Sequence, residues 1–183
     1  MTNTGTLGSS TRTFLDALTR ELFQTETSAS QHCTREAKRL GSTAPALALR
    51  AVAEHAEAVL RELPALAERN NLPVSKGGNL AGHMFSELRD KLFDRLIDCE
   101  RSYRGTLLGC RHGLDVVRTL GHLAASVGNL ELDAFCTRWL NTRTVLVERV
   151  EDELAWFAQH PDQATRLARP LVPSLRERSH ASS

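Results

Sequence analysis

The sequence predicts an all-α protein that folds as a four-helix bundle. Apolar residues recur at steps of three and four along most of the chain, which is the pattern of helices that each bury one face. Ala and Leu fill most apolar positions and aromatic residues make up only 5% of the chain, a composition that favours helices over sheets. With 183 residues, the chain has the length of one domain with a sizeable core.

The first part of the chain is expected to form a helical hairpin after a disordered N-terminus at residues 1–10, which are mostly small and polar. The first helix spans 11–40 and should end at Gly41. The second helix spans 44–70, where Pro64 should kink it or end its regular part early. Their short connection makes the two helices antiparallel. Their core positions are Leu15, Leu18, Leu22, Ala29, Cys33 and Ala37 in the first helix, and Leu49, Val52, Ala56, Val59, Leu63 and Leu66 in the second.

The next stretch of helical pattern follows a break at 71–79 and covers residues 80–127, which is very long for one helix in a domain of this size. We divide it into a short crossover helix at 80–91 and a third main helix at 93–127, which would make the second and third main helices run parallel. The alternative is a single long helix, which would give a simple up-down-up-down bundle. The sequence leaves both topologies open.

The fourth main helix is expected at 130–160, after a turn at Gly128 and Asn129. Prolines then recur in residues 161–183, which are expected to form a flexible C-terminal tail. The predicted helical bundle domain therefore covers residues 11–160.

Charged residues interrupt three of the apolar stripes: Glu26 in the first helix, Glu100 in the third and Arg143 in the fourth. A charge on a buried helix face must be paired, neutralised or bound to a metal, because an isolated buried charge is very costly. A pair of Arg143 with Glu26 or Glu100 would satisfy these charges directly. We therefore expect structural ion pairs inside the bundle.

A dimetal carboxylate site is the alternative for the acidic residues. Such a site needs one Glu from each of two helices and a Glu-x-x-His motif from each of the other two. Glu26 and Glu100 could supply the first pair. However, His55 has no Glu three residues before it, and Glu148 and Glu151 have no histidine partner. The arginine in the fourth stripe would also repel a metal ion, so we expect no cofactor, with iron or manganese on these five residues as the alternative.

Three glycines recur at every fourth residue of the third main helix: Gly105, Gly109 and Gly113. Helical spacing puts them opposite Glu100 and Leu107, on the expected outer face with Leu108, Val116 and Leu120. Small residues at this spacing let another helix approach closely. The partner would be the crossover helix or the same ridge of a second copy, and we favour a homodimer.

Bulk composition excludes some partners. The formal net charge of +1 gives no argument for nucleic acid, which usually binds a strongly basic face. No apolar run approaches the ~20 residues of a membrane span, and the N-terminus lacks the apolar core of a signal peptide. The four cysteines have no metal-binding spacing and suit reduced, buried thiols. We expect a cytoplasmic protein with no nucleic-acid or membrane partner.

Two short segments carry a resemblance. Residues 78–83 (GNLAGH) and 96–101 (LIDCER) resemble the crossover and third helix of small bacterial ferritin-like four-helix-bundle proteins of uncharacterised function. In those proteins a glycine-bounded segment with a histidine leads through a short helix to a helix that contains Cys-Glu. The resemblance implies the ferritin-like topology, with its short crossover helix between the second and third main helices. It also implies that Glu100 occupies the position of a ferritin-type metal ligand.

The sequence contains no complete catalytic motif, which favours a non-catalytic protein while the possibility of an enzyme stays open. The favoured hypothesis is a ferritin-like helical bundle that acts in protein interaction or in a stress response. The alternative is a divergent dimetal protein that acts in metal handling or oxidation chemistry. A third hypothesis is a small-ligand carrier with a pocket near Tyr103 and Trp139.

Overall fold

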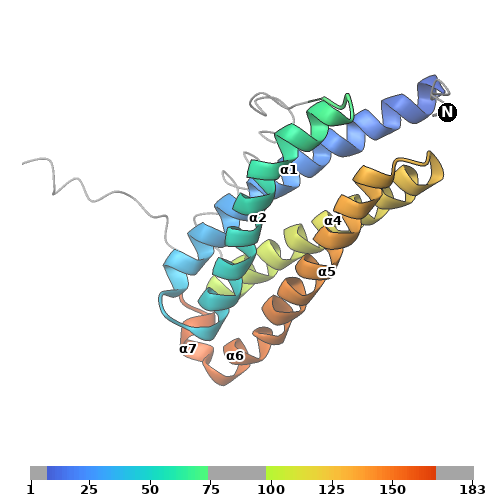
Figure 1. Ribbon diagram of the computed structural model, residues 1–183. Coiled ribbons are helices and arrows are strands. Elements are labelled where there is room, and N and C mark those ends of the chain that lie inside the picture. Colours follow the sequence, from blue (N-terminus) through green and yellow to red (C-terminus); the bar gives the residue numbers. More distant parts are fainter. Residues whose placement is uncertain (1–7, 74–97, 168–183) are drawn as a thin grey trace, which may run out of the picture.

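The computed structural model describes residues 8–73 and 98–167. Within these ranges the chain is all-α and contains no strand, which confirms the predicted class (Figure 1). The helices are α1 (Ser9–Leu40), α2 (Ala44–Arg69), α4 (Cys99–Ser126), α5 (Leu130–Asp152), α6 (Leu154–Gln159) and α7 (Pro161–Ala164). Each of these helices is too short or too polar to cross a lipid bilayer.

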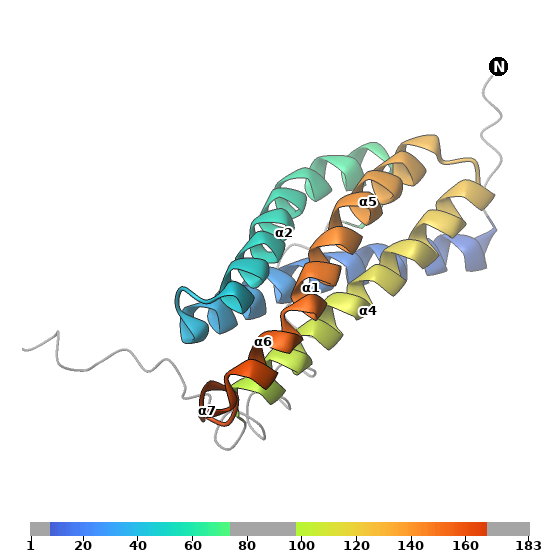
Figure 2. The ribbon, with the colours of Figure 1, turned by 90° about the horizontal axis from the view of Figure 1, so that it is seen from below.

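Four long helices lie side by side, with α1 packed against α2 and α4, and α5 packed against the same two helices (Figures 1 and 2). At one end of the bundle Arg69 of α2 forms an ion pair with Glu131 at the start of α5. Near the other end, Tyr103 of α4 donates a hydrogen bond to the carbonyl oxygen of Val150 of α5. Accordingly α1 and α5 run in one direction and α2 and α4 in the other, so that α2 ends and α4 begins at opposite ends of the bundle.

The core lies between the four long helices and is built from the predicted stripes. Every core position expected in the first two helices is buried except Ala29, which is partly buried. In α4 and α5 the largest buried apolar side chains are aromatic or branched, because these fill the space between helices most completely. They are Tyr103, Leu107, Leu114, Val116, Val117, Leu120, Leu132, Phe135, Trp139, Val147 and Val150.

Two helix boundaries differ from the sequence expectation. Although Pro64 removes a backbone hydrogen bond, α2 continues through it to Arg69, because Pro64 lies on the exposed side where water can bind the carbonyl group left free. The expected fourth helix divides at Glu153 into α5 and α6. The division redirects the chain so that the ring of Phe157 packs 5.1 Å from that of Tyr103.

The described chain extends past both ends of the expected bundle. At the N-terminus α1 begins at Ser9, inside the segment expected to be disordered. At the C-terminus α7 follows directly after α6, and the backbone carbonyl of Arg166 accepts a hydrogen bond from the amide of Cys99 at 2.9 Å. The Arg166 side chain donates to the carbonyl oxygen of Arg39 at 3.1 Å. The expected crossover helix at 80–91 lies outside the described residues.

Candidate functional site

Two oppositely charged side chains lie inside the bundle on diagonally opposed helices. Glu26 follows Leu22 by four residues in the buried stripe of α1, and Arg143 follows Trp139 by four residues in that of α5. Each of the two charged residues has only 1% of its surface exposed. Both helices pack against α2 and α4, so the two charges meet across the centre of the bundle.

Arg143 connects three helices through its guanidinium group. Its Nη2 donates to Glu26 Oε2 at 2.6 Å, and its Nε donates to Nδ1 of His55, on α2, at 3.0 Å. The guanidinium carbon also lies 4.9 Å from the centre of the Trp139 ring, which is a cation–π contact. We call Glu26, His55, Trp139 and Arg143 the central polar cluster. The ion pair expected between Glu26 and Arg143 is therefore part of the structure.

Burial changes the protonation of both partners of Arg143. Removal from water raises the pKa of Glu26 from 4.5 to about 7, although the charge and hydrogen bond of Arg143 act in the opposite direction. The nearby indole N–H of Trp139 also lowers the pKa of Glu26, and it does so least of these groups. Its geometry does not meet that of a normal hydrogen bond with a described residue. Burial, and then the charge of Arg143, lower the pKa of His55 to about 4. His55 is therefore neutral at pH 7, which suits an acceptor of the Arg143 hydrogen bond.

The candidate metal ligands do not come together in the described part of the chain. Glu26 and His55 both contact Arg143, so a guanidinium group occupies the space between them that a metal ion would need. Glu148 and Glu151 are exposed on α5, and Glu151 forms an ion pair with an exposed arginine of α4. No three His, Cys, Asp or Glu side chains of the described ranges are grouped as a metal ion requires. This donor set does not fit a dimetal centre.

Glu100 lies apart from the central polar cluster, which corrects the expectation that it interrupts a buried stripe. Its side chain is 28% exposed and forms an ion pair with Arg104 at 2.5 Å. The physical reason is its position, because α4 begins at Cys99 after a cap by the Asp98 side chain. Glu100 is thus in the first turn, where the helix dipole favours a negative charge. Cys99 and Tyr103 fill the buried positions at this end of α4.

The three glycines of α4 do not share one surface. Gly109 is exposed, and no described atom lies within 4 Å of the place that a Cβ would take. Its neighbour Leu108 is 67% exposed, as an outer face requires. Val116 and Leu120 were expected on the same face but are buried, because α4 packs against both α1 and α5. Gly105 is partly buried, whereas Gly113 is buried and its added Cβ would lie 3.8 Å from Thr25 of α1. Gly113 therefore serves packing inside this bundle and not on its outer face.

Two further buried contacts have only a weak signal in the sequence. The sulfur atoms of Cys33 in α1 and Cys110 in α4 lie 3.8 Å apart. Each cysteine belongs to an apolar stripe, which indicates burial but does not reveal which cysteines are neighbours. Glu36 and Arg39 form a second ion pair at 2.5 Å, with 5% and 6% of their side chains exposed. Their spacing of three residues on one helix could have indicated this pair.

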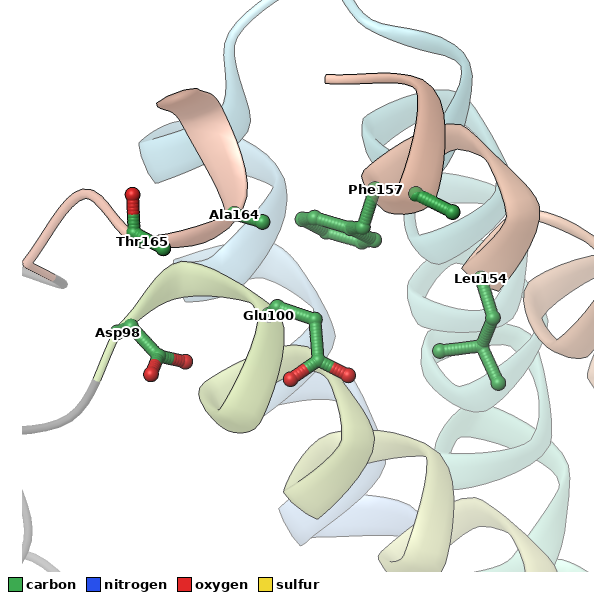
Figure 3. A pocket seen from close by; sticks show the side chains of 7 residues that line it. Asp98, Glu100, Leu154, Phe157, Ala164 and Thr165 are labelled. Atoms are coloured by element: carbon green, nitrogen blue, oxygen red, sulfur yellow. The ribbon is translucent and has the colours of Figure 1, made fainter. Parts of the chain in front are cut away.

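A shallow, open hollow of about 360 Å³ lies where α4, α6 and α7 meet (Figure 3). Leu154, Phe157 and Ala164 form its apolar side, and Asp98 and Glu100 its acidic side. A carrier pocket near Tyr103 and Trp139 was one expectation, but both of these side chains are buried and neither lines this hollow. Asp98 and Glu100 are already engaged as a helix cap and in an ion pair.

Comparisons with known proteins do not assign these features. Models of known protein families, curated protein sequences and solved structures all give no match to this chain. The function must therefore be argued from the central polar cluster, the paired cysteines and the exposed helix faces.

Proposed function

We propose that this chain is a non-catalytic helical bundle that acts through interaction with other protein chains, and that its central polar cluster is structural. The observation that carries the proposal is the double contact of Arg143 with the carboxylate of Glu26 and the imidazole of His55. These two side chains are the ones best placed for acid–base or metal chemistry inside the bundle. Both accept a hydrogen bond from the guanidinium group of Arg143, which is permanently charged.

The finer topology is also a proposal, namely the ferritin-like order with one long crossover. It is supported by the parallel directions of α2 and α4, since a simple up-down-up-down bundle would make these helices antiparallel. The ferritin-like resemblance would bring a dimetal site with it. The contacts of Arg143 argue against such a site on Glu26 and His55, so iron or manganese chemistry is the less favoured function.

The simplest protein partner is a second copy of this chain, bound on the outer face of α4. Leu108 exposes 67% of its surface there, and Gly109 leaves the helix backbone uncovered beside it. A helix from a second copy can approach such a surface closely, and an exposed leucine gains from being covered. We place this interaction in the cytoplasm, where the four cysteines, which form no disulfide in the structure, would stay reduced.

The test compares the solution mass of three proteins by light scattering after gel filtration. We expect the wild-type chain at twice its mass of 20.2 kDa and Leu108→Glu at the single mass. Leu47→Glu is the matched control, because Leu47 is 58% exposed on α2, a helix diagonal to α4, and this variant should stay dimeric. A monomeric wild-type protein, or a dimeric Leu108→Glu, would exclude this interface.

The same preparations decide between the two functions. Protein grown with added iron and manganese should contain neither metal in a stoichiometric amount, because Arg143 occupies the space between the internal donors. Elemental analysis by mass spectrometry measures this directly. A stoichiometric metal that is lost in Glu26→Ala would replace the structural function with the dimetal one, whatever the oligomeric state.

A further inference from the structure

Two cysteines from different helices meet inside the bundle, away from the contacts on which the proposed function depends. Cys33 is completely buried on α1 and Cys110 is 3% exposed on α4. Their sulfur atoms lie 3.8 Å apart, which is hydrogen-bond distance for two thiols. The two residues are 77 positions apart in the sequence, so a covalent bond between them would close a long loop.

We propose that Cys33 and Cys110 are a redox-active pair that peroxide converts to an intramolecular disulfide between α1 and α4. In the first step the thiolate of one cysteine attacks a peroxide oxygen, the O–O bond breaks, and a sulfenic acid and hydroxide form. In the second step the other thiol attacks the sulfenic sulfur and water leaves. Overall, two thiols and one hydrogen peroxide give one disulfide and two waters, so sulfur is oxidised and peroxide oxygen is reduced.

The surroundings of Cys33 favour its protonated thiol. The hydrogen bond to Cys110 and burial raise the pKa of Cys33 well above its usual value. Cys33 therefore keeps its proton at neutral pH, and either sulfur can be the donor in the contact between the two. The positive charge of Arg143 lowers the pKa of Cys33 and Glu26 raises it, but both effects are smaller than those of the hydrogen bond and burial. Peroxide that reaches the pair can react with either sulfur, and the other sulfur then completes the disulfide.

Packing makes the reaction slow but selective. Buried thiols react poorly with oxidants, so peroxide must reach the pair through transient opening of the bundle. Once a sulfenic acid forms, however, the second thiol is already in place beside it. The sulfur atoms must then approach each other by about 1.8 Å to reach a disulfide bond length, which small side-chain and helix shifts can supply. We therefore expect the disulfide and little further oxidation.

The experiment exposes the full-length wild-type protein to hydrogen peroxide, blocks remaining thiols, and maps peptides without reduction by mass spectrometry. We expect the peptide that contains Cys33 joined to the one that contains Cys110, lighter than their sum by two hydrogen atoms and separated again by dithiothreitol. The oxidised protein should unfold at a temperature higher by roughly 10 °C, because the disulfide restricts the unfolded chain. The reaction should be faster in mild urea, which increases opening.

Three single variants control the assignment. Cys33→Ala and Cys110→Ala should each lose both the joined peptide and the rise in unfolding temperature. Cys136→Ala is the matched control, because Cys136 is equally buried but lies on α5, and this variant should keep both. The proposal fails if the wild-type protein gives no Cys33–Cys110 peptide, joins Cys99 or Cys136 instead, or links only separate chains. The wild-type map decides the question even where a variant does not fold.

Discussion

At the scale of single residues, Arg143 is the decisive side chain of this molecule. It introduces a permanent charge into the core, and its position between Glu26 and His55 gives that charge two acceptors. Removing one partner of such a pair leaves an uncompensated buried charge and typically costs 3–5 kcal/mol. Replacing both partners with apolar residues of similar size is often neutral, so the pair specifies the arrangement of α1 and α5 more than it stabilises the fold.

The two acceptors of Arg143 have opposite effects on the pH dependence of stability. The pKa of Glu26 is raised from 4.5 to about 7 on folding, so its contribution is present below pH 4.5 and is lost as the pH rises through 7. The pKa of His55 is lowered from 6.5 to about 4, so its contribution is present above pH 6.5 and is lost as the pH falls through 4. Between pH 4.5 and 6.5 the free energy of unfolding falls with pH because of Glu26 and rises with pH because of His55, so the two effects partly cancel.

Single variants should separate these contributions. Relative to wild type, Glu26→Gln should become more stable as the pH rises from 4.5 to 7, by up to about 3 kcal/mol, because it lacks the carboxylate that is costly to ionise. Wild type should gain stability from His55 as the pH rises from 4 to 6.5, and His55→Asn should lack this gain. The difference should be smaller than for Glu26, because the ring is only half-buried. Urea unfolding at four pH values measures both differences. If both variants parallel the wild-type curve, neither pKa shift is real.

At the scale of helices, the glycines of α4 differ in how closely neighbouring helices approach them. Gly109 faces no described atom of its own chain, so in the Leu108→Glu background, which should be monomeric, Gly109→Ala should stabilise the chain by about 1 kcal/mol through helix propensity alone. At Gly121 an added Cβ would lie only 3.2 Å from the Cβ of Cys136, so α4 and α5 would have to separate slightly. In the same background, Gly121→Ala should therefore be less stable than Gly109→Ala by at least about 1 kcal/mol. Thermal unfolding of the two variants compares them, and equal stabilities would show that this interface adapts without cost.

Helix positions were largely predictable from the sequence, and the limits of the prediction have physical causes. The starts of α2 and α5 match the expectation because Pro45 and Asn129 act locally, as a first-turn proline and a helix cap. The division at Glu153 has no local signal such as glycine or proline, and the contact of Phe157 with Tyr103 that accompanies it is between residues far apart in the sequence. Glu100 was wrongly predicted to lie on a buried face for a similar reason, because periodicity does not show where a helix extends beyond the helices that pack against it.

At the scale of the whole molecule, the order of helices determines which charges can meet. Periodicity indicated that Glu26 and Arg143 face inward, but their pairing also depends on α1 and α5 being diagonal and parallel. The same arrangement brings Cys33 to Cys110, because α1 and α4 are neighbours. Neither the directions of the helices nor their neighbours can be read from the stripes. The central polar cluster was therefore predictable in its members on α1 and α5, and His55 could not be assigned as the second acceptor of Arg143.

The segment at 161–167 closes one end of the molecule and supports a prediction at this scale. Its Arg166 accepts a backbone hydrogen bond from Cys99 and donates one to the carbonyl oxygen of Arg39, which ties the start of α4 to the end of α1. A chain that ends at His160 should be less stable than one that ends at Leu167 by about 2 kcal/mol, since two hydrogen bonds are lost. Urea unfolding of the two truncated chains isolates this segment.

A third truncated chain separates the two hydrogen bonds. Arg166→Ala, made in the chain that ends at Leu167, removes the side-chain bond to Arg39 but keeps the backbone bond to Cys99, so its stability should lie between the other two. Hydrogen exchange should show a protected Cys99 amide in both longer chains and a fast-exchanging one in the chain that ends at His160, because that chain lacks the acceptor. Equal exchange in all three would mean that the first turn of α4 is held by its Asp98 cap and the core beneath it, and that the closing segment only covers them.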